Sequence, residues 1–130
     1  MHVTIVSTWF PTEVSAGLGI FVARHAASMA AAGHDIRVVH LVAAHVDDGT
    51  RRTRVMGVPV IRLPMTPSRP HEVLAARRAL GTLTAGSDIV HTHAISTLMP
   101  YALRRPREPW LHTEHWSGLA NGGAALGTIA

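Results

Sequence analysis

The sequence predicts an α/β fold in which a parallel sheet is flanked by helices. Short runs rich in Val and Ile alternate along the chain with longer segments whose apolar residues recur at helical spacing. Strands that alternate with helices in this way are typical of βαβ units, and the strands of such units run parallel. A chain of 130 residues suits a single domain, and no repeat of fixed period interrupts it.

Five strands and three helices are expected. The strands are residues 3–6, 35–42, 58–64, 88–93 and 109–115. The helices are residues 20–32, residues 70–83, and a third that is capped by Ser96 or Thr97 and ends at Leu103. Gly33 suits a left-handed helix end, and Pro70 suits the first turn of a helix. Residues 47–54, DDGTRRTR, are interpreted as a polar excursion between two strands.

The last residues of the sequence differ from the rest. Residues 119–130 are nearly all small, and the glycines at 122 and 123 weaken any helix there. The expected domain, residues 1–130, is therefore incomplete at its C-terminal end. We expect weak cover over the last strand, and hence a marginally stable chain that self-associates.

Charge and composition narrow the classes of partner. All 12 basic residues are Arg, they are scattered without interleaved aromatic residues, and the formal net charge is +4. This pattern argues against nucleic-acid binding and is typical of solvated faces, although it favours anionic partners such as phosphorylated ligands. The chain has no Cys, no secretory signal pattern and no apolar run long enough to span a membrane. We expect a soluble, cytoplasmic protein, with peripheral membrane contact left open.

A ligand site is predicted at one edge of the sheet. Polar clusters follow three strands at their carboxyl ends, in residues 7–19, 91–96 and 113–118. Right-handed βαβ connections bring these ends to the same edge, where open parallel sheets bind ligands. Residues 7–19 form a loop about twice as long as usual. We expect this loop to cover a ligand, to be mobile when empty and to become ordered on binding.

Gly17 and Gly19 precede the first helix. The unpaired N–H groups and partial positive charge of a helix start favour phosphate, and glycine permits its close approach. A plain glycine turn explains the same residues, and both interpretations stay open. The dinucleotide fingerprint G-x-G-x-x-G is absent, because Val22 stands where the third glycine belongs, so no NAD site is expected.

Histidines follow the fourth and fifth predicted strands. His91 and His93 alternate by two and so share one face of a strand, while His112 and His115 flank Glu114. Imidazole and carboxylate groups suit zinc or iron, which leaves a metal-dependent hydrolase as one alternative. The spacing is not that of a specific metal motif, so a hydrogen-bonded polar pocket is favoured and no metal is assigned.

Two tryptophans lie beside turns at the same edge. Trp9 follows the first predicted strand, and Trp116 follows the fifth. A flat indole ring there can stack on a sugar face or pack under the loop, and both roles stay open.

Four ordered segments resemble the amino-terminal domain of the retaining GT-B glycosyltransferases, the nucleotide-sugar-dependent enzymes of family 4. The segments are WFP…GLGIFVARHAASMAAAGHDIRVV, GVPVIRLP, SDIVHTHAIS and PWLHTEHWSG. They follow the family's order and cover nearly the whole chain up to Gly118. The resemblance implies a Rossmann-like sheet and transfer of a sugar from a nucleotide-sugar donor to an acceptor with retention of configuration, without a metal or other cofactor.

The resemblance also implies roles for individual residues. His115 is the catalytic position, because it matches a histidine that contacts the donor sugar. His93 matches a histidine that shapes the acceptor side. The acceptor-side pocket is assigned to four residues, namely His93, Trp9, Trp116 and Ser117.

The glycine loop and the family's second domain complete what the resemblance implies. Gly19, with Gly17, matches a loop that approaches the donor phosphate and the acceptor, although Leu18 fills the place of a second adjacent glycine. The second Rossmann-like domain, which binds the nucleotide and stabilises the leaving diphosphate, is absent from the sequence. We therefore expect this chain to be inactive alone and to need a second domain or partner chain. The alternative is a non-catalytic phosphosugar-binding module or one subunit of a split transferase.

Overall fold

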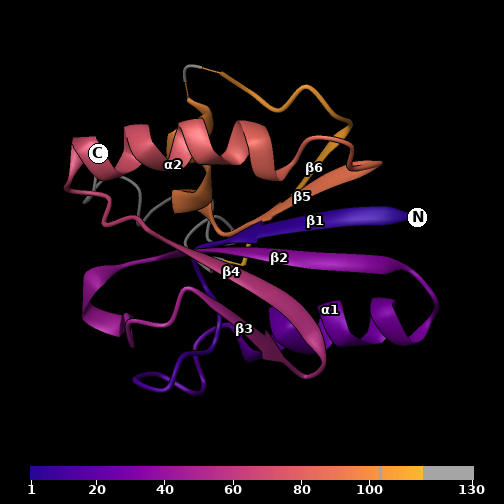
Figure 1. Ribbon diagram of the computed structural model, residues 1–130. Coiled ribbons are helices and arrows are strands. Elements are labelled where there is room, and N and C mark those ends of the chain that lie inside the picture. The colour runs from indigo at the N-terminus through magenta and orange to yellow at the C-terminus, as the bar shows by residue number, and fades with distance from the viewer. Residues whose placement is uncertain (103, 116–130) are drawn as a thin grey trace.

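The computed structural model describes residues 1–102 and 104–115. They form one six-stranded sheet with a long helix on each face, as Figure 1 shows. The strands are β1 (His2–Ser7), β2 (Asp35–Val42), β3 (Arg52–Val55), β4 (Val58–Pro64), β5 (Ile89–His93) and β6 (Trp110–Thr113). The helices are α1 (Ile20–Ala31) and α2 (Pro70–Leu83), with the 3₁₀ helices η1 (Ala44–Val46) and η2 (Ile95–Tyr101). The small-residue segment 119–130 lies outside the described residues, as do Leu103, Trp116 and Ser117.

The strand order is that of a Rossmann-like domain. The order is β3-β4-β2-β1-β5-β6, and every neighbouring pair is parallel except β3 with β4. After β1 the chain adds β2, β3 and β4 on one side, with β3 outermost, and then returns to add β5 and β6 on the other side of β1 (Figure 1). This reversal is the doubly wound arrangement, and it confirms the predicted α/β class with a parallel sheet flanked by helices.

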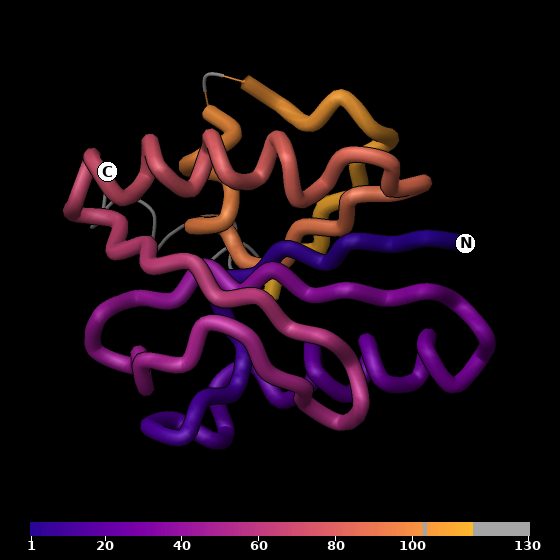
Figure 2. The backbone as a smooth tube through the Cα atoms, in the orientation of Figure 1, coloured from indigo at the N-terminus to yellow at the C-terminus, as the bar shows by residue number. Residues whose placement is uncertain are grey.

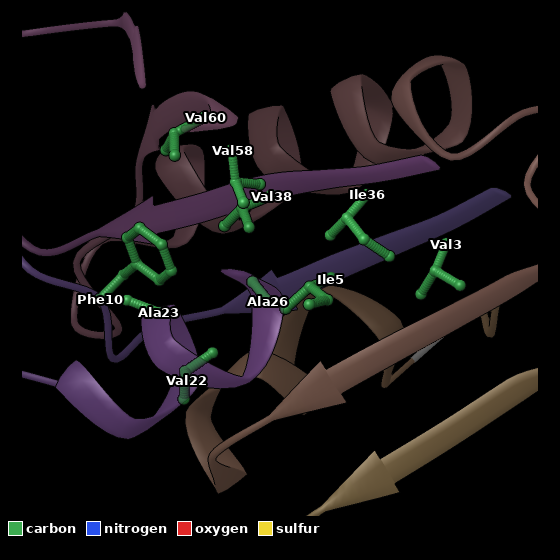
Figure 3. Packing of buried hydrophobic residues seen from close by; sticks show 10 residues of the cluster. All are labelled: Val3, Ile5, Phe10, Val22, Ala23, Ala26, Ile36, Val38, Val58 and Val60. Atoms are coloured by element: carbon green, nitrogen blue, oxygen red, sulfur yellow. The ribbon is translucent and has the colours of Figure 1, made fainter. Parts of the chain in front are cut away.

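Alternate residues of the central strands point into two separate cores. In β1, Ile5 joins the cluster under α1 and Val6 joins the cluster under α2, and both side chains are fully buried. Figure 3 shows the first cluster, in which Val22 and Ala26 of α1 lie with residues from the strands. Phe10 belongs to the same cluster although it comes from the loop after β1. Burial on both faces explains why these strands are apolar almost throughout.

The prediction that residues 47–54 are a polar excursion is wrong for the second half of that segment. Arg52–Val55 is strand β3, which pairs antiparallel with β4. Met56 and Gly57 connect the two strands with φ values of 51° and 79°, the left-handed conformation that a two-residue hairpin turn requires. The arginines at 52 and 54 point to solvent at the edge of the sheet, so their charge hides the strand in the sequence.

The third predicted helix differs in type and in its cap. It is the 3₁₀ helix η2, which begins at Ile95, and its capping residue is Ala94 with no side-chain hydrogen bond. Ser96 and Thr97 therefore do not cap it in the predicted manner. Their hydroxyls instead bond to the segment after β1, because the two loops meet there.

Other local predictions are confirmed. Gly33 follows α1 with a φ of 98°, and Pro70 is the first residue of α2. The strand expected at 109–115 is shorter, since β6 ends at Thr113. In the part of the chain that the structure describes, no helix is long and apolar enough to cross a membrane.

Candidate functional site

The point where the strand order reverses lies between β1 and β5. Ser7 at the end of β1 pairs in register with His93 at the end of β5. The chain leaves β1 towards α1 on one face, and it leaves β5 towards η2, which packs with α2 on the other face. Ligands of open α/β sheets bind in the crevice that such a divergence creates.

Two hydrogen bonds tie together the two loops that leave this point, and a third lies within the loop after β5. The hydroxyls of Thr8 and Ser96 lie 2.8 Å apart. The backbone N–H of Thr8 donates to Oγ1 of Thr97 at 3.1 Å, and that hydroxyl donates to the carbonyl oxygen of His93 at 2.6 Å. Ala94 adopts a φ of 72°, unusual for a residue with a side chain, to let the chain turn here. The base of the crevice is therefore held by bonds between segments almost 90 residues apart.

The long loop after β1 is anchored over its first half. The Phe10 ring is fully buried, and Nη2 of Arg62 donates to the Pro11 carbonyl at 2.8 Å. The Thr12 hydroxyl donates to the Val46 carbonyl at 2.7 Å, so the loop lies against the segment between β2 and β3, as Figure 2 traces. Exposure is concentrated in residues 13–17. Mobility before ligand binding is thus a prediction that concerns this outer half.

Gly19 permits a close backbone approach that carries Trp9 to the start of α1. Its φ is 61°, and a Cβ atom there would lie 2.3 Å from the carbonyl oxygen of Trp9. This contact gives Gly19 a packing role besides the predicted one near the donor phosphate. Gly17 is exposed and has no atom within 4 Å of an added Cβ, so packing does not require glycine there.

Four histidines gather above the ends of β5 and β6; we call them the imidazole cluster, made up of His25, His91, His93 and His115. The rings of His91 and His93 share one face of β5, as predicted, with centroids 4.0 Å apart. The ring of His115 stacks on that of His93, and Nε2 of His115 lies 2.9 Å from Nδ1 of His93. His25 reaches the cluster from α1. The centroid of its ring lies 5.9 Å from that of His91 and 6.0 Å from that of His93.

Burial and mutual repulsion favour the uncharged form of three members of this cluster, His91, His93 and His115. Desolvation, followed by the neighbouring histidines, lowers the pKa of His91 to about 4 and the pKa of His93 to about 3. Desolvation also lowers the pKa of His115. Neutral imidazoles can each donate one hydrogen bond and accept another. Nε2 of His93 is buried without a partner among the described residues.

An aromatic surface adjoins the cluster. The ring of Phe21 lies 4.4 Å from that of His115, and Trp9 lies 6.4 Å from both rings. Phe21 is 43% exposed, and Trp9 is half-buried. Apolar rings beside neutral hydrogen-bonding groups form a surface of the kind that suits a sugar, whose faces are apolar and whose rim is polar.

The structure brings together some of the predicted site residues and separates others. Trp9, Gly19, His93 and His115 lie at one place. His112 points to the opposite face of β6, where it bonds to Thr92 at 2.7 Å, so it does not join them. Within residues 1–102 and 104–115, no three metal-ligating side chains are grouped to hold a metal ion.

Sequence reasoning missed His25 and Phe21. They are separated by one helical turn on α1, and the i,i+4 spacing after the glycine turn was the available signal. The apolar periodicity of α1 did not mark them, because both are exposed on the helix and face the crevice instead of the core.

These features define a Rossmann-like domain with a polar and aromatic site at its reversal point. The sequence model of the family described as "Glycosyl transferase 4-like domain" matches residues 16–130, most of the chain. The chain therefore belongs to this family, as the sequence motifs predict. A search of curated proteins returned no match.

Solved structures support the same fold. Sucrose-phosphate synthase from Thermosynechococcus elongatus aligns with a TM-score of 0.65 at 20% identity, over 96% of this chain and 36% of that chain. A second structure of that protein aligns with a TM-score of 0.60 at 17% identity, over 91% of this chain and 65% of that chain. The C-terminal domain of a Pyrococcus furiosus hydrogenase aligns with a TM-score of 0.53 at 12% identity, over 85% of this chain and 88% of that chain. The chain thus spans about a third of the first synthase chain, and these likenesses show the fold alone.

Proposed function

We propose that the chain is the acceptor-side lobe of a retaining GT-B glycosyltransferase that uses a nucleotide-sugar donor. The observation that carries the proposal is the contact of His115 with His93 and Phe21 at the reversal point of the sheet. Membership of the glycosyl transferase 4-like family supports the class of reaction. The nearby aromatic surface supports a sugar as the group that is handled.

His115 acts as a neutral hydrogen-bonding group towards the donor sugar. If Nδ1–H of His93 donates to Nε2 of His115, the proton of the His115 ring resides on Nδ1. That N–H has no partner among the described residues and can donate to a sugar hydroxyl. His93 therefore sets the tautomer and orientation of His115, in addition to shaping the acceptor side.

The start of α1 approaches the donor phosphate in this proposal. Gly19 is the capping residue of a 12-residue helix and carries no side chain that could cover its first N–H groups. The partial positive charge of a helix start favours an anion. Gly17 is exposed just before it and leaves room for a ligand.

A facing domain supplies the remaining interactions. Stabilising a leaving diphosphate requires charged or hydrogen-bonding groups fixed around it, together with correct orientation of donor and acceptor. The rings of His91 and His93 are neutral, because burial lowers their pKa, and they cannot neutralise the charge of a leaving diphosphate. We therefore propose that a second α/β domain or a partner chain is needed, and that the chain alone transfers no sugar.

The test replaces His115 in a protein reconstituted with the second domain or partner chain. We expect His115→Ala to lower turnover by about 100-fold and to leave the melting temperature nearly unchanged. His34→Ala is the matched control, because His34 is exposed in the turn after α1. Normal turnover with a lowered melting temperature would assign His115 a structural role and overturn the proposal. Saturable donor binding without any turnover would favour the binding-module alternative.

A further inference from the structure

A hollow lies towards the amino ends of β5 and β6, away from the candidate site. It has a volume of about 510 Å³ and lies between the last turns of α2, the end of η2 and the segment that leads into β6. In Figure 1 this segment returns above α2 towards the amino ends of β5 and β6, away from the arrowheads of the strands. A hollow of this size suits a small molecule.

Five arginines line this hollow, which we call the arginine pocket. Two come from α2 and three from the segment before β6; they are Arg77, Arg78, Arg104, Arg105 and Arg107. Only one acidic residue, Glu108, is among the lining residues. Nothing in the sequence brings these two groups together, because about 25 residues separate them.

The arginines of the pocket are left without carboxylate partners, whereas arginines elsewhere are paired. Arg51 bonds to Asp47 at 2.9 Å, and Arg62 bonds to Asp48 at 3.2 Å. In the described part of the chain, none of the five pocket arginines forms an ion pair or a hydrogen bond. Like charges held close together repel one another, so this arrangement favours binding of an anion.

Neutral donors add to the charge. The hydroxyl groups of Thr82 and Tyr101 also belong to residues of the pocket, and the Tyr101 hydroxyl is buried without a partner among the described residues. Burial raises the pKa of Tyr101, so its hydroxyl stays protonated and adds no negative charge to the pocket. Glu108 is engaged, since its Oε1 accepts a hydrogen bond from Thr84 at 3.2 Å.

We propose that the arginine pocket is a binding site for a phosphate-bearing anion that carries two or more negative charges. Planar guanidinium groups bind phosphate oxygens in pairs, and several of them from two chain segments can surround one group. The site is separate from the proposed sugar site, and the inference does not depend on the proposed glycosyltransferase function. The phosphate belongs to a soluble ligand or to a lipid headgroup, and the two sources are distinguished below.

The test measures binding of inorganic pyrophosphate to the 130-residue chain by calorimetry at low salt, about 50 mM. We expect saturable binding that the double variant Arg78→Gln/Arg104→Gln weakens at least about tenfold. The control is Arg24→Gln/Arg52→Gln, which removes the same charge from exposed arginines outside the pocket and is expected to change affinity by less than about threefold. Melting temperatures of both variants show whether each is folded.

Sedimentation with vesicles, with and without phosphatidylglycerol, separates the two sources. Pyrophosphate binding that the pocket variant loses supports a soluble ligand. Sedimentation with anionic vesicles that only the pocket variant loses supports the same site with a lipid headgroup as its ligand. Absence of both kinds of binding, or equal loss in the pocket and control variants, would overturn the proposal.

Discussion

The two edges of the sheet present opposite kinds of polar surface. At the carboxyl edge, the histidines of the imidazole cluster contact one another, and burial lowers the pKa of His91 and His93 so that these two rings are neutral at pH 7. At the amino edge, the arginine pocket holds five arginines and one glutamate, and among the described residues none of these arginines forms an ion pair. The formal net charge of +4 conceals this division. The carboxyl edge therefore suits a neutral, hydroxyl-bearing ligand, whereas the amino edge suits an anion.

The two edges also differ in how closely other atoms approach the backbone. Of the changes considered, Gly19→Val is expected to lower the free energy of unfolding most. The added side chain would meet the Trp9 carbonyl and require an unfavourable positive φ. We expect the free energy of unfolding in urea to fall by at least about 3 kcal/mol.

Gly81→Ala is the matched change at the arginine pocket. Gly81 lies within α2, and no atom lies within 4 Å of an added Cβ. We expect this variant to gain about 0.5–1 kcal/mol, since alanine favours the helix. Equal loss in the two variants would contradict the difference in packing between the edges.

Acid is expected to destabilise the carboxyl edge only. His40 lies in β2, in register with Ser7 of β1, and is fully buried. Burial lowers the pKa of His40 to about 4. The folded protein therefore binds fewer protons than the unfolded chain between pH 6.5 and about 4, so stability falls as the pH drops through this window. His40 alone accounts for up to about 3 kcal/mol of this loss.

Urea unfolding of His40→Leu at pH 7 and at about pH 4.5 checks this assignment. Leucine fills a similar buried volume and cannot titrate, so it removes the proton binding of His40 from the comparison. We expect the variant to be less sensitive to acid than the natural protein. His34→Leu is the control, because His34 is exposed. The same pH dependence in all three proteins would rule out His40 as the cause.

Amide exchange would sharpen the comparison within the β1–α1 loop. We expect residues 13–17 to exchange fast without ligand and to slow when a nucleotide-sugar binds the reconstituted transferase. The amide hydrogen of Thr12 should be protected throughout, because this residue is buried and its N–H donates to the Ser15 carbonyl at 3.1 Å. Residues 77–81 at the arginine pocket serve as the unaffected reference. Slow exchange at 13–17 without ligand, unchanged on binding, would contradict the covering role of this loop.

The smallest effect is expected at the outer strand β6. Leu111 is 53% exposed there, at the edge of the described sheet. We expect the chain to self-associate in sedimentation velocity and Leu111→Arg to weaken this association about tenfold. Met56→Arg, at the turn between β3 and β4, replaces a similarly exposed residue near the other outer strand and should have no effect. A monomeric natural chain would contradict the expectation.

Local patterns in the sequence determined the class of fold and several ends of elements. Apolar periods of two and of about 3.6 residues arise from the geometry of one segment, so they can be recognised without any partner. Gly33 and Pro70 act within their own turns, and both predictions are confirmed. The alternation of His91 and His93 placed them on one face for the same reason.

Tertiary structure alone decided which segments meet. Strand β3 is stabilised by pairing with β4, so its arginine-rich sequence did not reveal it. The hydroxyls of Ser96 and Thr97 turned away from the predicted cap because Thr8 lies beside them in the fold. His25 joined the imidazole cluster, and arginines that look scattered in the sequence gathered in one pocket. Such contacts depend on the packing of distant segments, and no local pattern encodes the free energy of that packing.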